Sequence, residues 1–293
     1  MPAAVTGGRP ATGGRRFPLA WLGALPFLGY TAAFLMLPTV IILVQAFGDG
    51  SGRPTLANVR ELGEGYVVDA FVNSLLLSVE SAVLGAVLGA LLAYAVVTGR
   101  PDGLLRRVVT SVCGVFAQFG GVMLAFAFIA TVGPQGFLTL LLQNGGLDVA
   151  GAWLFELNGL VVVYLYFQVP LMVLVFVPAL DGLKPQWREA TESLGGTTWH
   201  YWRHVAGPIL APPFLGALLL LFANAFSAFA TAAALISQGG IIVPLQIQNA
   251  LTSEVVLGRE NVGKALALGM IVVVALVMTG QALLQRRTAR WLR

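Results

Sequence analysis

The sequence predicts an all-α, polytopic membrane protein with six transmembrane helices. Hydrophobic residues make up 57% of the 293 residues and charged residues only 10%, and the mean hydropathy is +0.84, well above that of soluble domains. The apolar residues form six charge-poor runs, each long enough for the ~20 helical residues that cross a hydrocarbon core. These runs are longer and more continuously apolar than the strands of a membrane barrel, so helices are expected.

The apolar runs also divide the chain. They cover approximately residues 19–47, 70–98, 108–132, 160–180, 209–236 and 265–284. Residues 1–18 are rich in Gly, Pro and Arg and are predicted to be a disordered cytoplasmic segment. Residues 19–69 are predicted to hold the first helix, interpreted as an uncleaved signal anchor, and an outer loop. The main transmembrane domain is predicted over 70–285, with a cytoplasmic loop at 181–208, followed by a basic cytoplasmic tail at 286–293.

The basic residues predict the orientation. With the N-terminus inside, only four of the 17 Lys and Arg residues lie outside, namely Arg53, Arg60, Arg259 and Lys264. The positive-inside rule therefore places both termini in the cytoplasm. The pI near 9.6 then reflects this orientation and contact with anionic lipid head groups, and it is not evidence for nucleic-acid binding.

One long polar segment interrupts the apolar runs, and we call residues 185–210 the polar island. Pro185 suits a first helical position, and the pair that begins at Gly195 offers a left-handed helix stop. Thr197 or Thr198 can then cap a second short helix. The island is therefore predicted to be two helical pieces joined by a glycine elbow, with mixed charges and aromatic residues suited to contact.

The polar island also carries a motif, which is Glu189-Ala190-Thr191, three residues, Gly195, and then Val205 and Pro208. It resembles the EAA loop of the membrane subunits of binding-protein-dependent ABC importers, the type I importer permeases. Thr191 stands where Ala is usual, and Ala206-Gly207 directly precedes the proline. The exchange of Ala for Thr keeps the residue small. The resemblance covers roughly residues 70–285.

The resemblance implies a type I importer permease fold and a transport function without catalytic residues on this chain. Two permeases, expected to be a heterodimer, would span the bilayer with two cytoplasmic ATPase subunits and an extracytoplasmic solute-binding protein. No cofactor is expected on this chain, since ATP and Mg would bind the ATPase. The coupling helix that contacts the ATPase would comprise Glu189, Ala190, Thr191, Leu194 and Gly195.

Three other motifs do not support enzyme chemistry. Residues 258–265 match a phosphate-binding loop except at Ala265, which replaces the Ser or Thr that would hold magnesium. His200 and His204 have the spacing of helical metal ligands but lack the accompanying Glu, so polar interfacial residues are the favoured interpretation and no metal site is predicted. The single cysteine, Cys113, excludes an internal disulfide. The sequence therefore favours a transport protein over an enzyme.

Polar residues within the apolar runs are candidates for the solute path. Glu80 is the only charged residue well inside a run, and exposing a carboxylate to lipid costs ~2.5–3.5 kcal/mol, so it should face the protein interior or water. Either it lines the path and favours a cation, or it pairs with a neighbouring helix. The weaker candidates are Gln118, Tyr164, Gln168, Asn224, Ser227 and Thr231. Each of these is equally consistent with a helix-to-helix hydrogen bond.

A stripe of small residues runs beside Glu80 and suits close helix packing. It comprises Ser74, Ser78, Ser81, Gly85 and Gly89.

The cargo is indicated only by resemblance. Residues 226–247 resemble permeases of the polyamine, ferric-ion, thiamine and aminoethylphosphonate group, and we expect the spermidine/putrescine type. An ABC permease for ferric ion, thiamine, phosphonate or sugar is the alternative. An ATP-independent secondary carrier would be expected to show inverted repeats, which the two halves lack. An intramembrane enzyme is disfavoured by the absence of a catalytic cluster.

Overall fold

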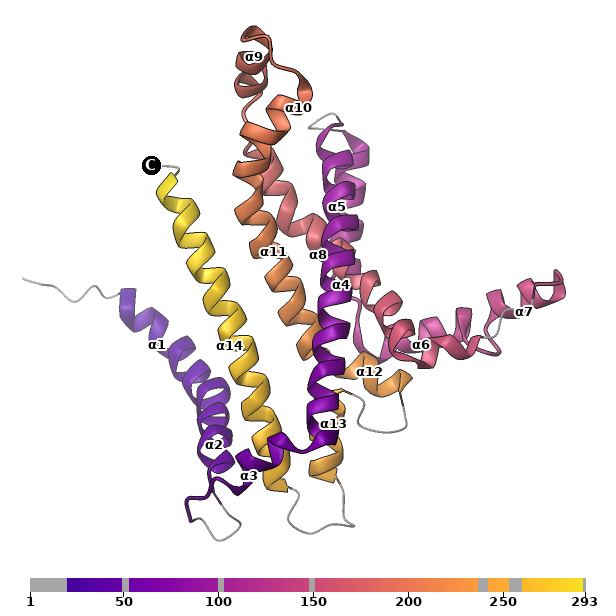
Figure 1. The fold of residues 1–293 in the computed structure, drawn as a ribbon, viewed down its shortest axis with the longest axis vertical. Helices are drawn as coiled ribbons and strands as arrows, with labels where there is room; N and C mark the ends of the chain where they lie inside the picture. The colour runs from indigo at the N-terminus through magenta and orange to yellow at the C-terminus, as the bar shows by residue number, and fades with distance from the viewer. Residues whose placement is uncertain are drawn as a thin grey trace, which may run out of the picture.

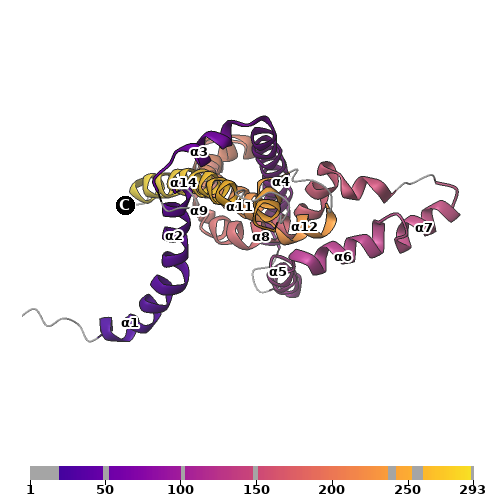
Figure 2. The same cartoon turned by 90° about the horizontal axis from the view of Figure 1, so that it is seen from below.

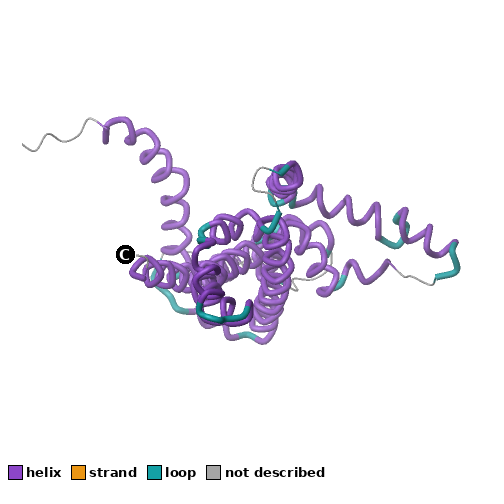
Figure 3. Tube along the Cα trace, turned by 90° about the horizontal axis from the view of Figure 1, so that it is seen from above, coloured by secondary structure: helices purple, strands orange, loops and turns teal. Residues whose placement is uncertain are grey.

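The computed structural model describes residues 20–48, 53–99, 103–147, 151–236, 242–252 and 260–291. Within these ranges every regular element is a helix, which confirms the all-α prediction (Figure 3). Six helical stretches are long and apolar enough to cross a membrane, as predicted. They are Gly23–Ala46, Gly65–Val97, Gly121–Asn144, Leu157–Asp181, Thr198–Ser227 and Val262–Leu284. The predicted N-terminal segment 1–18 lies outside the described residues.

Helices α4 (Gly65–Val97), α8 (Leu157–Asp181) and α11 (Gly207–Ser227) form the packed centre of the bundle (Figure 1). The small-residue stripe of α4 is buried, as predicted. A Cβ added at Gly85 would lie 2.7 Å from Cβ of Gln168, and one added at Gly89 would lie 2.5 Å from Cβ of Met172. The absence of side chains at these two glycines therefore allows α4 and α8 to approach closely.

The N-terminal helices form an arm that leaves the bundle. It consists of α1 (Ala20–Thr31), the π-helical η1 (Ala32–Met36) and α2 (Leu37–Ala46), and it packs on the bundle through α2 and α14 (Glu260–Trp291) (Figure 2). Two short helices, α3 (Ala57–Arg60) and η2 (Glu61–Gly63), connect the arm to α4. Asn58 Nδ2 donates hydrogen bonds to the carbonyls of Ala46 and Gly48, which holds this connection at the end of α2. Helix α14 continues to Trp291, into the segment predicted as a tail.

Two predicted runs are broken, so the expected continuous helices at 108–132 and 209–236 are wrong. In the first, α5 (Leu104–Phe116) ends before residues 117–120, and α6 (Gly121–Val132) and α7 (Phe137–Asn144) turn away to the side of the bundle (Figures 1 and 2). Gly121 has φ +72°, a conformation that suits glycine. In the second, α11 ends at Ser227, and α12 (Ala230–Leu235) and α13 (Val243–Thr252) follow.

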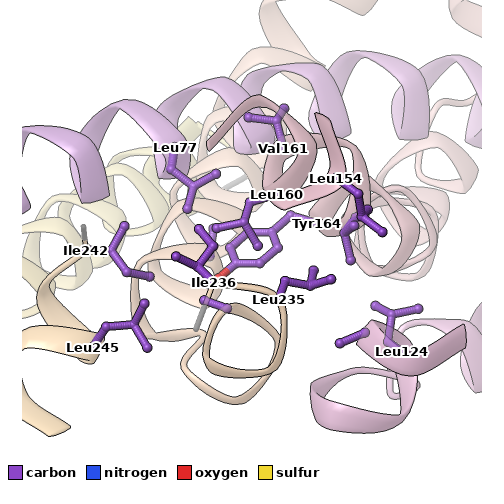
Figure 4. Close-up of a cluster of buried hydrophobic side chains, with 14 of the residues drawn as sticks. Leu77, Leu124, Leu154, Leu160, Val161, Tyr164, Leu235, Ile236, Ile242 and Leu245 are labelled. Carbon is purple, nitrogen blue, oxygen red and sulfur yellow. The ribbon is translucent and has the colours of Figure 1, made fainter. Parts of the chain in front are cut away.

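Buried apolar side chains hold the broken helices against α8. Figure 4 shows the Tyr164 ring of α8 beside Leu160, with Leu235 and Ile236 from the α12 region close to it. The same cluster includes Leu124 of α6 and Leu154 of the short helix η3 (Gly151–Phe155). The breaks are therefore part of a packed core.

Candidate functional site

The polar island folds into two short helices joined at a glycine, as predicted. Helix α9 (Pro185–Ser193) ends with a Gly196 N–H that donates to the Thr191 carbonyl, and Gly195 has φ +75°. Thr197, the first of the two proposed caps, precedes α10 (Thr198–Tyr201) and caps it. Thr197 Oγ1 accepts a hydrogen bond from the His200 backbone N–H, and His200 Nδ1 accepts one from the Thr197 backbone N–H. We call residues 185–201 the α9–α10 hairpin.

The hairpin projects beyond one end of the helix bundle (Figure 1). Glu189, Ala190 and Gly195 are exposed, and the side chain of Leu194 is 88% exposed. Thr191 is half-buried, and its hydroxyl donates to the Trp187 carbonyl within α9. A helix that presents both an apolar leucine and a carboxylate to its surroundings is suited to contact with another protein.

Both ends of the hairpin continue into residues that contact other helices of the bundle. Before it, Asp181 at the end of α8 pairs with Arg106 at the start of α5. After it, Trp202 packs edge-on against Tyr94 of α4, with 5.4 Å between ring centroids. Trp202 opens the π-helical η4 (Trp202–Ala206), which leads into α11. A displacement of the hairpin would therefore reach α4, α8 and α11 directly.

Two of the predicted path residues do not share one site. Gln168 is fully buried on α8, and its Nε2 donates to the Leu221 carbonyl of α11 at 3.1 Å, so it makes a helix-to-helix hydrogen bond. Its Oε1 has no partner in the described part of the chain. Glu80 lies on an exposed face of α4, away from the buried stripe, and makes no hydrogen bond or ion pair with another described residue.

The other two, Asn224 and Ser227, lie together at a polar cavity of about 300 Å³ between the two helix breaks. The cavity is also lined by Gln118, Phe167, Phe229 and Thr231. Although the sequence indicated most of these polar residues singly, it did not indicate the breaks that bring them together. The Gly120-Gly121 pair was the available signal for the first break; for the second, between α11 and α12, neither Gly nor Pro marks the chain.

The alternative motifs have structural roles here. Residues 260–265 of the phosphate-loop-like segment belong to α14 and are therefore helical, and Ala265 is buried. Residues 258 and 259 lie outside the described ranges. His200 takes part in the α10 cap. The His200 ring stacks on the ring of His204, with 6.1 Å between the ring centroids. In the described ranges, no group of three or more His, Cys, Asp or Glu residues is placed to hold a metal ion.

Comparison with known proteins identifies the family. Residues 85–290 match the model of the binding-protein-dependent transport system inner membrane component. The ferric transport system permease protein FbpB of Actinobacillus pleuropneumoniae is 27% identical over 202 residues, 67% of this chain and 28% of the relative. The sulfate transport system permease protein CysT of Escherichia coli is 27% identical over 165 residues, 56% of this chain and 57% of the relative. The chain thus spans less than two thirds of the length of either protein.

A solved structure has the same fold. A chain of a bacterial alginate ABC transporter, crystallised in complex with an alginate pentasaccharide-bound periplasmic protein, superposes with a TM-score of 0.73 at 18% identity. The match covers 92% of this chain and 94% of that chain. With the six candidate membrane helices, these similarities indicate a multi-pass inner-membrane protein. The chain belongs to the family of inner membrane components of binding-protein-dependent transport systems.

Proposed function

We propose that this chain is a permease subunit of an ATP-driven importer and that its α9–α10 hairpin couples the ATPase to the transmembrane helices. The observation that carries the proposal is the exposed hairpin with the Glu189-Ala190-Thr191 and Gly195 motif, attached at both ends to the bundle. The hairpin end of the bundle and the C-terminus would both face the cytoplasm, where the ATPase binds ATP and Mg.

Attachment at both ends supports a coupling role. Closure of the ATPase around ATP would displace α9. The chain itself would carry the displacement back to α8, from which the Asp181–Arg106 pair would pass it to α5, and the Trp202–Tyr94 contact would pass it to α4. Tilting of packed helices about such contacts is a common form of conformational change in proteins. The chain would thereby rock between states open to opposite sides of the membrane.

Membership of the family supports the expected partners. A second permease subunit, expected to differ from this one, would complete the transmembrane core, and a solute-binding protein would dock at the end opposite the hairpin. The two relatives described above are named for ferric ion, a cation, and for sulfate, an anion. Similarity therefore favours neither sign of charge for the cargo, and a polyamine cargo stays a prediction.

The test is a hairpin variant in the assembled transporter. In the double variant Glu189→Ala/Gly195→Val, we expect at least a tenfold loss of binding-protein-stimulated ATP hydrolysis, with normal amounts of permease in the membrane. The loss is expected because one change removes an exposed carboxylate and the other strains a residue at φ +75°. Gln186→Ala, also exposed on α9 but outside the motif, is the matched control.

Undiminished stimulation in the double variant would refute the coupling role. Uptake by the permease pair without any ATPase subunit would instead support the secondary carrier.

A further inference from the structure

We infer that the polar cavity between the two helix breaks is a solute-contact site that recognises uncharged hydrogen-bonding groups, such as hydroxyls and amides. The inference rests on the proposed transport function, and it assigns the site and the chemical class of the groups it binds. We call this cavity the break cavity. It is lined by Gln118, Phe167, Asn224, Ser227, Phe229 and Thr231, with backbone of the two breaks between them.

The break cavity lies where the candidate membrane span Thr198–Ser227 ends and the span Gly121–Asn144 begins. Helix α5 has 13 residues, so the first break lies about 20 Å from its beginning. Asn224 is nearly five turns into α11, about 26 Å from Gly207. Measured from the hairpin end of the bundle, both distances are shorter than the thickness of a hydrocarbon core, about 30 Å, and they place the cavity toward the far side of that core. Irregular backbone within the apolar layer is tolerated only where protein buries it or where it lines a water-filled cavity.

Specific side chains hold the two breaks in place. Thr231 Oγ1 accepts from the Gly121 N–H at 2.9 Å and donates to the Gly121 carbonyl at 3.3 Å, which joins α12 to the start of α6. The buried Tyr164 hydroxyl donates to the Ala228 carbonyl at 2.9 Å, which fixes the end of α11. Tertiary hydrogen bonds therefore hold the breaks in a defined conformation, unlike frayed helix ends.

The side chains that line the break cavity leave hydrogen-bonding groups open to it. In the described part of the chain, the amides of Gln118 and Asn224 have no hydrogen-bond partner, whereas Ser227 donates its proton to the Ala223 carbonyl and keeps its lone pairs. Unpartnered amides in an apolar layer are unfavourable, so they need water or a solute. The cavity volume of about 300 Å³ is at the small end of small-molecule sites.

The absence of charge on the described residues that line the break cavity indicates the chemical class of the solute groups. None of the described residues that line the break cavity is charged, and Glu80 is not among them. A bare ion would therefore find no counter-charge there, and burying one without a partner is costly. Amide and hydroxyl groups instead match a solute's hydroxyls, amides or bound water, and the Phe167 and Phe229 rings border its apolar parts. An ion would pass only with its hydration shell.

Thiol labelling tests the site without knowledge of the cargo. Cys113 is the only cysteine, so Cys113→Ala provides a background without thiols in the assembled transporter in membrane vesicles. Ser227→Cys and Asn224→Cys are then each treated with a cationic and an anionic membrane-impermeant methanethiosulfonate reagent. The control is Ala217→Cys, on the same helix but 2% exposed.

Both cavity variants should react at least tenfold faster than Ala217→Cys. Their ratio of cationic to anionic rates should lie within about threefold of that of free cysteine. Rates no faster than the control, in variants present at normal levels, would overturn the water-accessible site. A ratio shifted more than tenfold would overturn the uncharged class. Labelling needs no ATP, so a hairpin double variant that stays coupled would refute the proposed function and leave the labelling result standing.

Discussion

The α9–α10 hairpin and the break cavity are built in different ways. The hairpin is one contiguous segment, and its shape is fixed by short-range bonds such as the Thr197–His200 cap. The break cavity collects side chains from α8 and from two distant breaks, where the residues Gly121 and Thr231 that hold them are 110 positions apart. The hairpin should therefore tolerate changes elsewhere in the chain, whereas the cavity depends on the whole packed core.

The largest effect is expected where both regions share their scaffold, at the contact between α4 and α8. Gly89→Ala would place a Cβ 2.5 Å from Cβ of Met172 and 2.8 Å from the Val169 carbonyl oxygen. We expect a loss of at least about 2 kcal/mol of stability, because backbone atoms cannot yield as a side chain can. Thermal unfolding in detergent measures this loss. Gly114→Ala, in open space on α5, is the control, and equal unfolding temperatures would contradict the close contact.

A smaller effect is expected from a variant that alters the break cavity but not the hairpin. Thr231→Val keeps the side-chain shape but removes both bonds to Gly121, and it leaves a backbone N–H without its partner, at about 1–3 kcal/mol. We expect lower thermal stability and altered thiol labelling at Ser227→Cys, with unchanged co-purification of the ATPase. Thr131→Val is the control, since that exposed hydroxyl bonds only within its own helix. Weakened ATPase binding in Thr231→Val would show that the regions are not independent.

The smallest effect concerns the link between hairpin and bundle. Tyr94→Leu removes the ring that packs on Trp202, an aromatic contact of about 1 kcal/mol, so coupling between binding protein and ATP hydrolysis should fall about fivefold. Tyr94→Phe keeps the ring and should retain coupling. The measurement is the ratio of stimulated to basal hydrolysis in vesicles. Equal ratios in the two variants would exclude a role for the ring contact.

The sequence predicted the hairpin well because its signals are local. Pro185 at a helix start, Gly195 in a left-handed conformation and Thr197 as a cap each act over a few residues. The break cavity was not predicted, since both runs are continuously apolar and the bonds of Tyr164 and Thr231 join residues 64 and 110 positions apart. Composition reveals a run long enough to cross the membrane but not where tertiary bonds divide it.

Charge within the bundle was only partly predictable. Glu80 was expected to face protein or water, yet in the isolated chain it lies on an exposed face of α4. The same periodicity that predicted the small-residue stripe places Glu80 on the side of α4 away from it. Which molecule covers that side depends on a partner that the sequence of one chain does not contain. The role of Glu80 therefore stays a prediction.

The π-helix η4 has a consequence for how this segment compares with its relatives. A π-turn holds one residue more than an α-turn, so η4 acts as a one-residue insertion between the motif and α11. Because the wider turn takes up the extra residue, the hairpin keeps its orientation about the axis of α11, whereas the same residue held in a regular α-helix would rotate the hairpin by about 100°. An alignment with a sequence that has a regular α-turn at this place would therefore need a gap between Gly195 and Pro208. Without that gap, the residues of the hairpin would be matched one position out of register with those of α11.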